Sequence, residues 1–286
     1  MRPVMRSVMR PVMRSLMRTR MIVLVGACAA LGACAADNLT PEPTASPTPP
    51  VECLPDLDGT LTAAEVPVVL DTPLDFYVGG NVQVDVAGAG SGDTRRWDWS
   101  TERPGDTVDA TVAGVLGTRW YAGQFPGGQF VAPAAGGLDG IYAKDGQGVY
   151  LLGLASPTDA PATKTVLRYA APVAVLRFPL IAGARWSEVG TVTGGTLNGL
   201  PYNGTDTYEL AADVRGELHL PYVRFTDVLR VRTLVTSRPS VGGGATTRRQ
   251  VGFWAECFGE VGRATSRANE AAEDFTTAET QRRLAI

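Results

Sequence analysis

Residues 140–155 read GIYAKDGQGVYLLGLA, and this segment carries the clearest signal of the fold class. Two apolar runs, Ile141–Ala143 and Val149–Leu154, flank the polar stretch Lys144–Gly148. Asp-Gly between apolar runs favours a tight turn, because glycine accepts the positive φ that hairpin turns require. The segment therefore predicts an antiparallel β-hairpin.

Side chains alternate between apolar and polar on both sides of this hairpin. The alternation is clear in residues 81–86 (NVQVDV) and in residues 95–100 (RRWDWS), where both tryptophans fall on one face. Residues 228–235 and 249–258 predict longer strands, and the glycines 242–244 predict a loop between them. Because successive side chains of a strand point to opposite faces, this pattern is typical of half-buried strands.

Glycine and proline account for 33 and 20 of the 286 residues, which predicts many turns. Helical periodicity is weak, and residues 269–274 favour a short helical turn near the end. Short strands with frequent turns are typical of antiparallel sheets that curl or close. The fold class that we predict is mainly β: a single antiparallel curved sheet, forming a half-barrel or a barrel, with very little helix.

Residues 1–33 have the layout of a signal peptide. Residues 1–20 contain six arginines and no acidic residue, and the apolar run Met21–Ala33 follows them. At 13 residues this run is too short to span a bilayer comfortably. The repeated Met-Arg pairs have two interpretations. They belong to the signal, or they precede a true start at one of the later methionines, Met13, Met17 or Met21.

Leu31-Gly32-Ala33-Cys34 resembles the lipobox of bacterial lipoproteins. The resemblance implies that diacylglycerol is attached to Cys34 and that the signal is cleaved just before it, which gives stable anchoring once a second chain is added. Val25–Cys28 matches less well, since cleavage there would halve the apolar run. Ala35 stands where an aspartate would signal inner-membrane retention, so the resemblance favours the outer membrane. The alternative is an unmodified cysteine in a cleaved signal.

Residues 34–50 are rich in Pro, Thr and Ser and are expected to form a lipidated, disordered tether, and residues 51–286 are expected to form the β domain. Without the arginines of the signal, the mature chain has 20 basic and 29 acidic residues. Such a surface does not attract phosphate backbones, so we expect no nucleic-acid partner. The expected partner is the membrane, through the lipid anchor.

Two cysteines remain once Cys28 is removed with the signal and Cys34 carries lipid. An exported domain lies in an oxidising compartment, so Cys53 and Cys257 are expected to form one disulfide. This bond would tie the first residues of the domain to a late strand. The alternative is two separate buried thiols.

A degenerate calcium loop is the candidate metal site. Placing the glycine of its Asp-Gly pair at the sixth position of an EF-hand loop puts Asp56 third, Asp58 fifth and Glu65 twelfth. The first position falls on Leu54, which offers no side-chain oxygen, so we expect no working metal site. The better-supported interpretation is structural, because Asp-Gly forms a turn and Thr62–Glu65 forms a capping box.

A catalytic constellation is missing from the sequence. Residues 56–60 (DLDGT) match the nucleophile motif of haloacid dehalogenase-type phosphatases, but no βαβ pattern follows them. His219 is the single histidine, and its apolar neighbours place it on a strand face. The chain contains neither a Gly-x-Ser-x-Gly nucleophile motif nor a Cys-x-x-Cys zinc motif. We therefore expect no catalytic residue, no cofactor and a non-enzymatic domain.

Trp97, Trp99 and Trp120 are the candidates for the wall of a ligand cleft. Aromatic side chains on the concave face of a curled sheet can line an apolar pocket. The alternative is that they belong to the core.

Three segments resemble a diffuse class of bacterial lipoproteins of unknown function. Residues 175–186 are similar to their apolar-Pro-Leu…Gly-x-x-Trp segment, residues 225–231 to a second recurring strand, and residues 253–262 to the closing strand pair. Some of these proteins have the lipoprotein-carrier fold, a curved antiparallel half-barrel with an apolar concave face. The resemblance covers roughly residues 170–265 and implies no catalytic residue. Cys257 replaces the usual small or apolar residue, which supports a disulfide particular to this lineage.

We expect an exported outer-membrane lipoprotein whose domain lies in the periplasm or on the cell surface. Its concave face is expected to hold an apolar ligand or an envelope protein. The alternative is a secreted or surface-attached hydrolase that uses two carboxylates, which glycoside chemistry requires about 5–9 Å apart in a cleft. Which acids would meet depends on the tertiary structure.

Overall fold

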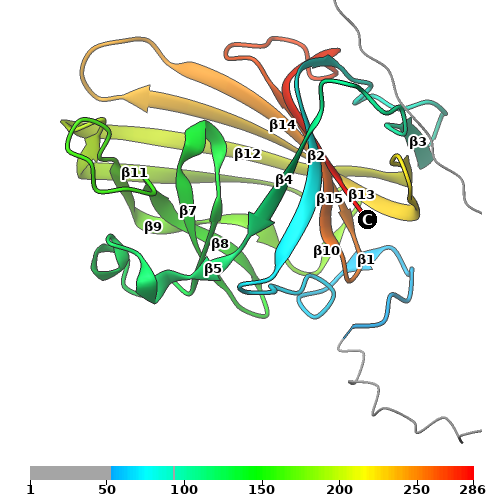
Figure 1. Cartoon of the computed structure of the whole chain (residues 1–286), viewed down its shortest axis with the longest axis horizontal. Coiled ribbons are helices and arrows are strands. Elements are labelled where there is room, and N and C mark those ends of the chain that lie inside the picture. Colours follow the sequence, from blue (N-terminus) through cyan, green and yellow to red (C-terminus); the bar gives the residue numbers. More distant parts are fainter. Residues whose placement is uncertain (1–52, 93) are drawn as a thin grey trace, which may run out of the picture. The chain divides into compact units, whose positions relative to one another are not determined.

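Thirteen strands follow one another in a single antiparallel sheet that is nearly closed into a barrel (Figure 1). The structure, a computed structural model, describes residues 53–92 and 94–286. The strand order is β4-β2-β16-β15-β14-β13-β12-β11-β9-β8-β7-β6-β5, with β3 paired to β12 outside this path and with β1 and β10 forming a separate pair. The strands are β1 Thr60–Leu61, β2 Pro73–Gln83, β3 Thr94–Asp98, β4 Thr107–Val112, β5 Gly114–Val115, β6 Phe130–Pro133, β7 Asp139–Lys144, β8 Gly148–Ala155, β9 Val166–Arg177, β10 Leu180–Ile181, β11 Arg185–Leu197, β12 Leu200–His219, β13 Arg224–Pro239, β14 Thr246–Ala255, β15 Gly259–Ser266 and β16 Thr277–Leu284.

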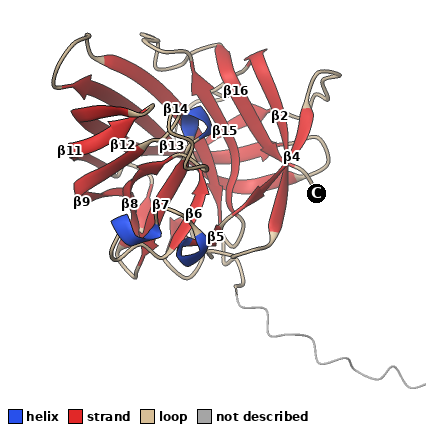
Figure 2. Cartoon of the chain, turned by 60° about the vertical axis from the view of Figure 1, so that its left-hand side comes forward, coloured by secondary structure: helices blue, strands red, loops and turns tan. Residues whose placement is uncertain are grey.

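The predicted mainly β fold with very little helix is confirmed. Figure 2 shows that strands and their connecting loops make up nearly all of the domain. The helical segments of the described residues are three short 3-10 turns: η1 Leu116–Thr118, η2 Ala122–Gln124 and η3 Ala135–Gly137.

The two ends of the strand order meet in the chain itself. β4 ends at Val112 and β5 begins at Gly114, so Ala113 alone separates the first strand of the sheet from the last. Ala113 also forms a bridge with Leu70, and its carbonyl accepts the Asp71 N–H at 2.7 Å. Among the described residues β4 is paired with β2 alone and β5 with β6 alone, so the chain itself, and not strand pairing between β4 and β5, links the two ends of the sheet.

The predicted hairpin is present as β7 and β8. β7 ends at Lys144 and β8 begins at Gly148, as the Asp-Gly turn requires. The Asp145 carboxylate accepts the N–H groups of Gln147 at 2.7 Å and of Gly148 at 3.0 Å. The side chain therefore satisfies two donors that the turn leaves free.

Two local predictions fail where tertiary contacts engage the backbone. The strand predicted over residues 81–86 is present only as far as Gln83, the last residue of β2, and the Asp85 and Val86 carbonyls then accept the indole N–H groups of Trp99 and Trp97. The helical turn predicted over residues 269–274 is absent, and Asn269 has a φ of 61°. The Arg249 side chain of β14 donates hydrogen bonds to the carbonyls of Glu270 at 3.1 Å and Ala271 at 3.2 Å, so these carbonyls are not used in a helical turn.

A second layer covers the outer face of the barrel wall. The last residues of β12, Arg215–His219, pair in parallel with β3. Phe253 and Trp254 are neighbours on β14 and so point to opposite faces of the sheet. Trp254 faces the barrel interior, whereas the ring centroid of Phe253 lies 4.7 Å from that of Trp97 and 4.9 Å from that of Trp99. The domain thus has an interior core and an outer core, on the two faces of the same strands.

Candidate ligand cavity

The barrel interior contains a cavity of about 510 Å³, a volume within the range of small-molecule sites. Every second residue of β14 from Arg248 to Trp254 lines it, as strand geometry requires. Most of the wall is apolar, and its members include Val68, Phe130, Leu151, Leu176, Leu210 and Val231. In such a site the few polar groups are the ones that orient a ligand.

Residues 53–69 cross one end of the barrel (Figure 1), and the last four of them reach the cavity. The segment contacts three turns at this end: β1 pairs with β10, Lys144 at the end of β7 binds its carbonyls, and Cys257 after β14 forms a disulfide with it. β7 and β14 lie on opposite sides of the strand order, so the segment crosses the whole opening. Its residues Val66–Val69 therefore form part of the cavity wall.

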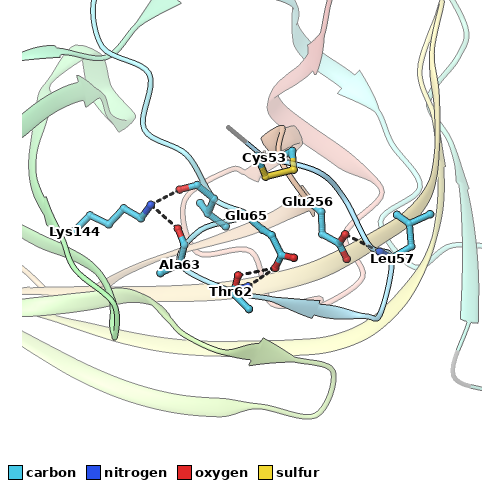
Figure 3. The surroundings of a disulfide bond; sticks show 9 residues. Cys53, Leu57, Thr62, Ala63, Glu65, Lys144 and Glu256 are labelled. Atoms are coloured by element: carbon cyan, nitrogen blue, oxygen red, sulfur yellow. Dashed lines mark hydrogen bonds between the residues drawn. A yellow bond between two sulfur atoms is a disulfide. The ribbon is translucent and has the colours of Figure 1, made fainter. Parts of the chain in front are cut away.

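Two kinds of contact hold this segment in place (Figure 3). The predicted disulfide between Cys53 and Cys257 is confirmed, with 5.5 Å between the Cα atoms. Lys144 Nζ donates to the carbonyls of Ala63 at 2.7 Å and Val66 at 2.6 Å. Burial lowers the pKa of Lys144. The segment is thus bound to both sides of the barrel.

Charged side chains form a polar band on the cavity wall. Arg263 donates to both carboxylate oxygens of Glu260, each at 2.7 Å. Burial by itself would lower the pKa of Arg263, but the adjacent Glu260 carboxylate has the larger effect, so the pKa of Arg263 is raised. Arg282 faces the same space, and burial lowers its pKa. Burial also raises the pKa of the Tyr142 phenol, which keeps this hydroxyl a hydrogen-bond donor.

A second polar group lies farther along the cavity. The Tyr169 hydroxyl donates to the Asp206 carboxylate at 2.7 Å and lies 2.8 Å from the Tyr208 hydroxyl. Burial raises the pKa of both phenols above the ordinary tyrosine value. Asp206 and Tyr208 both line the cavity, and the one carboxylate of this group, that of Asp206, is already hydrogen-bonded to the Tyr169 hydroxyl.

The acids of the candidate calcium loop separate in the structure. The Glu65 carboxylate accepts the Thr62 N–H at 2.8 Å, which is the contact that a capping box makes. Glu65 does not belong to the cluster of acids that contains Asp56 and Asp58. Glu256 takes its place, and one carboxylate oxygen from each of the three acids lies within 4.8 Å of the others. Sequence reasoning missed Glu256, whose one signal was its position next to a disulfide cysteine.

The tryptophans singled out in the sequence lie away from the cavity. Trp97 and Trp99 are fully buried in the outer core. Trp120 packs in a third cluster, where its indole N–H donates to the Ser156 carbonyl at 2.9 Å. Trp254 is the tryptophan that lines the cavity. Alternation in the sequence does not show which face of a strand becomes the concave one.

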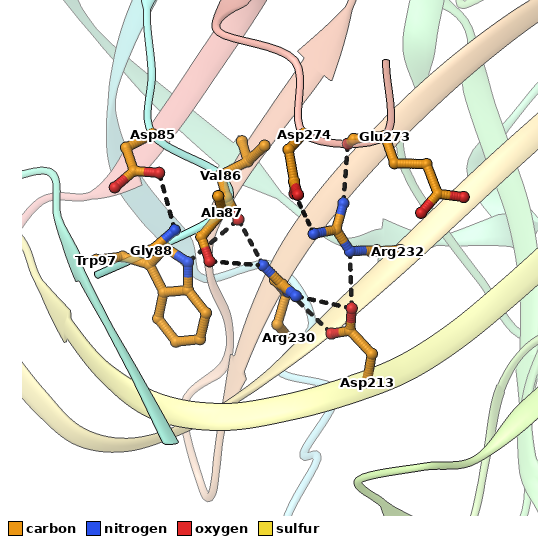
Figure 4. Close-up of polar contacts among 10 residues, drawn as sticks. All are labelled: Asp85, Val86, Ala87, Gly88, Trp97, Asp213, Arg230, Arg232, Glu273 and Asp274. Atoms are coloured by element: carbon orange, nitrogen blue, oxygen red, sulfur yellow. Dashed lines mark hydrogen bonds and ion pairs between the residues drawn. The ribbon is translucent and has the colours of Figure 1, made fainter. Parts of the chain in front are cut away.

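An arginine network fixes the outer layer beside Trp97 (Figure 4). Arg230 donates to both oxygens of Asp213 at 2.8 Å and to the Val86 carbonyl at 2.7 Å. Arg232 shares Asp213 and also pairs with Asp274. These contacts join β12 and β13 to two distant segments, which makes the network structural.

The remaining candidates have simple positions. Cys34 and Cys28 lie outside the described residues, as do the predicted signal peptide and tether. His219 is the last residue of β12, and its Nε2 lies 3.2 Å from the Glu217 carboxylate. Across residues 53–92 and 94–286, no helix has the length and apolar character needed to cross a membrane.

No protein-family model matches the chain, and neither a curated protein nor a solved structure matches it. The resemblance to β-rich bacterial lipoproteins therefore stays a prediction. The fold and the cavity define a structural class: a nearly closed antiparallel β-barrel with an apolar interior cavity. An N-terminal segment held by a disulfide crosses one end of the barrel and reaches that cavity.

Proposed function

We propose that this chain is a membrane-anchored lipoprotein of the cell envelope whose β-barrel binds an apolar ligand. The observation that carries the proposal is the cavity of about 510 Å³ with its mostly apolar wall. Its interior position favours a small molecule over a partner protein, because a protein needs an exposed surface to dock on. The domain acts by binding and is non-enzymatic.

The cell-envelope location rests on the sequence, with one supporting observation from the structure. The lipobox-like segment ending at Cys34 provides the anchor, and residues 34–50 provide the tether. The Cys53–Cys257 disulfide fits an exported domain, because disulfides persist in oxidising compartments.

The positions of the cavity carboxylates support binding over the hydrolase alternative. Asp206 is paired with Ser237 of β13, whereas Glu260 is aligned through β14 with Leu229 of the same strand. Residues 229 and 237 lie about 25 Å apart along a strand that rises about 3.3 Å per residue. Glycoside hydrolysis needs its two carboxylates within about 10 Å.

Ligand binding can be tested on residues 51–286, which include both cores and the disulfide and belong to one compact unit. The domain is produced in an oxidising compartment, and native mass spectrometry is expected to detect co-purified lipid. The neutral fluorescent probe N-phenyl-1-naphthylamine should bind saturably. Val175→Trp, which puts an indole into the cavity, should abolish this binding. Val189→Trp, on the exposed face of β11, should leave it intact.

Two results would contradict the proposal: no saturable binding by the wild-type domain, or equal binding by the two tryptophan variants. The anchor has a separate test. Cys34→Ser should leave the precursor uncut or release the protein from the membrane fraction, whereas Cys28→Ser should behave as wild type. Normal membrane retention and normal palmitate labelling of Cys34→Ser would refute the anchor.

A further inference from the structure

Two arginines are neighbours on the cavity wall. Arg263 of β15 and Arg282 of β16 are directly paired in the strand register, and both line the cavity. Like charges directly opposite each other destabilise a sheet. In the described part of the chain one carboxylate, Glu260, accompanies them, and Arg263 binds both of its oxygens.

Arg282 forms no ion pair with any described residue. Its guanidinium carbon lies 3.9 Å from the centroid of the Phe76 ring, and one nitrogen lies 3.5 Å from the Thr111 hydroxyl oxygen. The aromatic ring offsets part of the lost hydration. Burial lowers the pKa of Arg282, and the Glu260 carboxylate only partly opposes this shift. Glu260 is the nearby acid that favours the charge of Arg282, but Arg263 binds both of its oxygens, so the cavity contains a partly desolvated cation without an ion pair of its own.

The other charged side chains on the cavity wall do not pair with Arg282 either. Arg248 is already paired with Glu279. Asp206 accepts the Tyr169 hydroxyl and lies about 20 Å from Arg282 along the strands, at about 3.3 Å per residue. The excess positive charge is therefore local to Arg282, beside a wall that is otherwise mostly apolar.

We propose that the ligand of the cavity is an amphiphile with one anionic head group, a fatty carboxylate, whose carboxylate binds Arg282 while its chain lies against the apolar wall. This inference rests on the proposed function and names its ligand class. A guanidinium can bind a carboxylate through two parallel N–H groups. The Tyr142 and Thr111 hydroxyls, both on the cavity wall, provide further donors. A bound head group would also neutralise the repulsion between Arg282 and Arg263.

Calorimetric titration of residues 51–286 with decanoate, decanol and acetate tests this inference. Decanoate should bind at least tenfold more tightly than decanol, because it adds hydrogen bonds between charged groups to the same chain. Arg282→Met should weaken decanoate binding about tenfold to a hundredfold and leave decanol binding unchanged. Arg282→Lys, which keeps the charge, should retain part of the preference. Arg168→Met removes an exposed arginine of β9 and is the matched control that should change neither affinity.

The outcomes separate this inference from the proposed function. Equal affinity for decanoate and decanol, unchanged in Arg282→Met, would overturn the inference and leave apolar binding intact. Binding of neither probe would remove both proposals. Acetate binding as tight as decanoate would reveal a simple anion site and overturn the inference. An equal loss of decanol binding in a folded Arg282→Met domain would show that the side chain only shapes the cavity.

Discussion

Arg283→Met should destabilise the domain by about 4 kcal/mol, whereas Arg282→Met, one residue earlier, should change its stability by less than about 1 kcal/mol. Successive residues of β16 point to opposite faces of the sheet. Arg282 therefore faces the cavity without an ion pair, and Arg283 faces the outer layer, where it pairs with Asp106. The two substitutions are chemically identical and differ only in this environment.

The magnitude follows from the contacts of Arg283. Its side chain is 2% exposed and that of Asp106 is 5% exposed. Arg283 also donates to the carbonyls of Trp99 at 2.6 Å and Thr101 at 2.7 Å. Removing one member of a buried ion pair costs about 3–5 kcal/mol, because the other charge stays buried without compensation. Loss of Arg282 forfeits a cation–π contact of about 1–2 kcal/mol, and this loss is offset because the substitution removes a desolvated charge and relieves a like-charge repulsion.

Urea unfolding followed by far-ultraviolet circular dichroism measures both variants. For a domain of this size, Arg283→Met should also lower the Tm by about 10 °C. The double variant Arg283→Met with Asp106→Leu should recover part of the loss, because it leaves no unpaired carboxylate. A loss below about 1 kcal/mol in Arg283→Met, or equal losses in the two single variants, would refute this reasoning.

Replacing Cys53 and Cys257 together by serine should lower the free energy of unfolding by up to about 5 kcal/mol, since the bond closes a loop with a sequence separation of 204 residues; an unchanged urea midpoint would contradict this. Calcium at 1 mM should raise the Tm by no more than about 2 °C, since a dissociation constant near 1 mM stabilises by only about 0.4 kcal/mol. A rise of ten degrees would show that Asp56, Asp58 and Glu256 form a working site. Stability should fall as the pH rises above about 10, the ordinary tyrosine pKa, because the unfolded chain then releases protons that buried tyrosines such as Tyr169 keep. Tyr169→Phe should flatten this alkaline slope in pH-dependent unfolding, and an unaltered slope would speak against it.

Features that depend on neighbouring residues were predictable from the sequence. The β7–β8 hairpin follows from an Asp-Gly pair between apolar runs, because only a few turn types connect two strands so tightly. The Cys53–Cys257 disulfide joins two residues that lie 204 positions apart and was predictable for a different reason: in a chain expected to be exported, two remaining cysteines allow one pairing. The mainly β fold follows from the alternation of apolar and polar residues, which is a property of the sequence itself.

The cavity and its charges depend on how the whole sheet closes. Alternation places Phe253 and Trp254 on opposite faces of β14, but the direction in which the sheet curves decides which of them meets the cavity. Arg263 and Arg282 become neighbours through the register of β15 and β16. Register and curvature are properties of all the strands together, because a slip of one residue would turn every side chain of a strand to the other face. A site built from such long-range pairings therefore has no counterpart in any local pattern of the sequence.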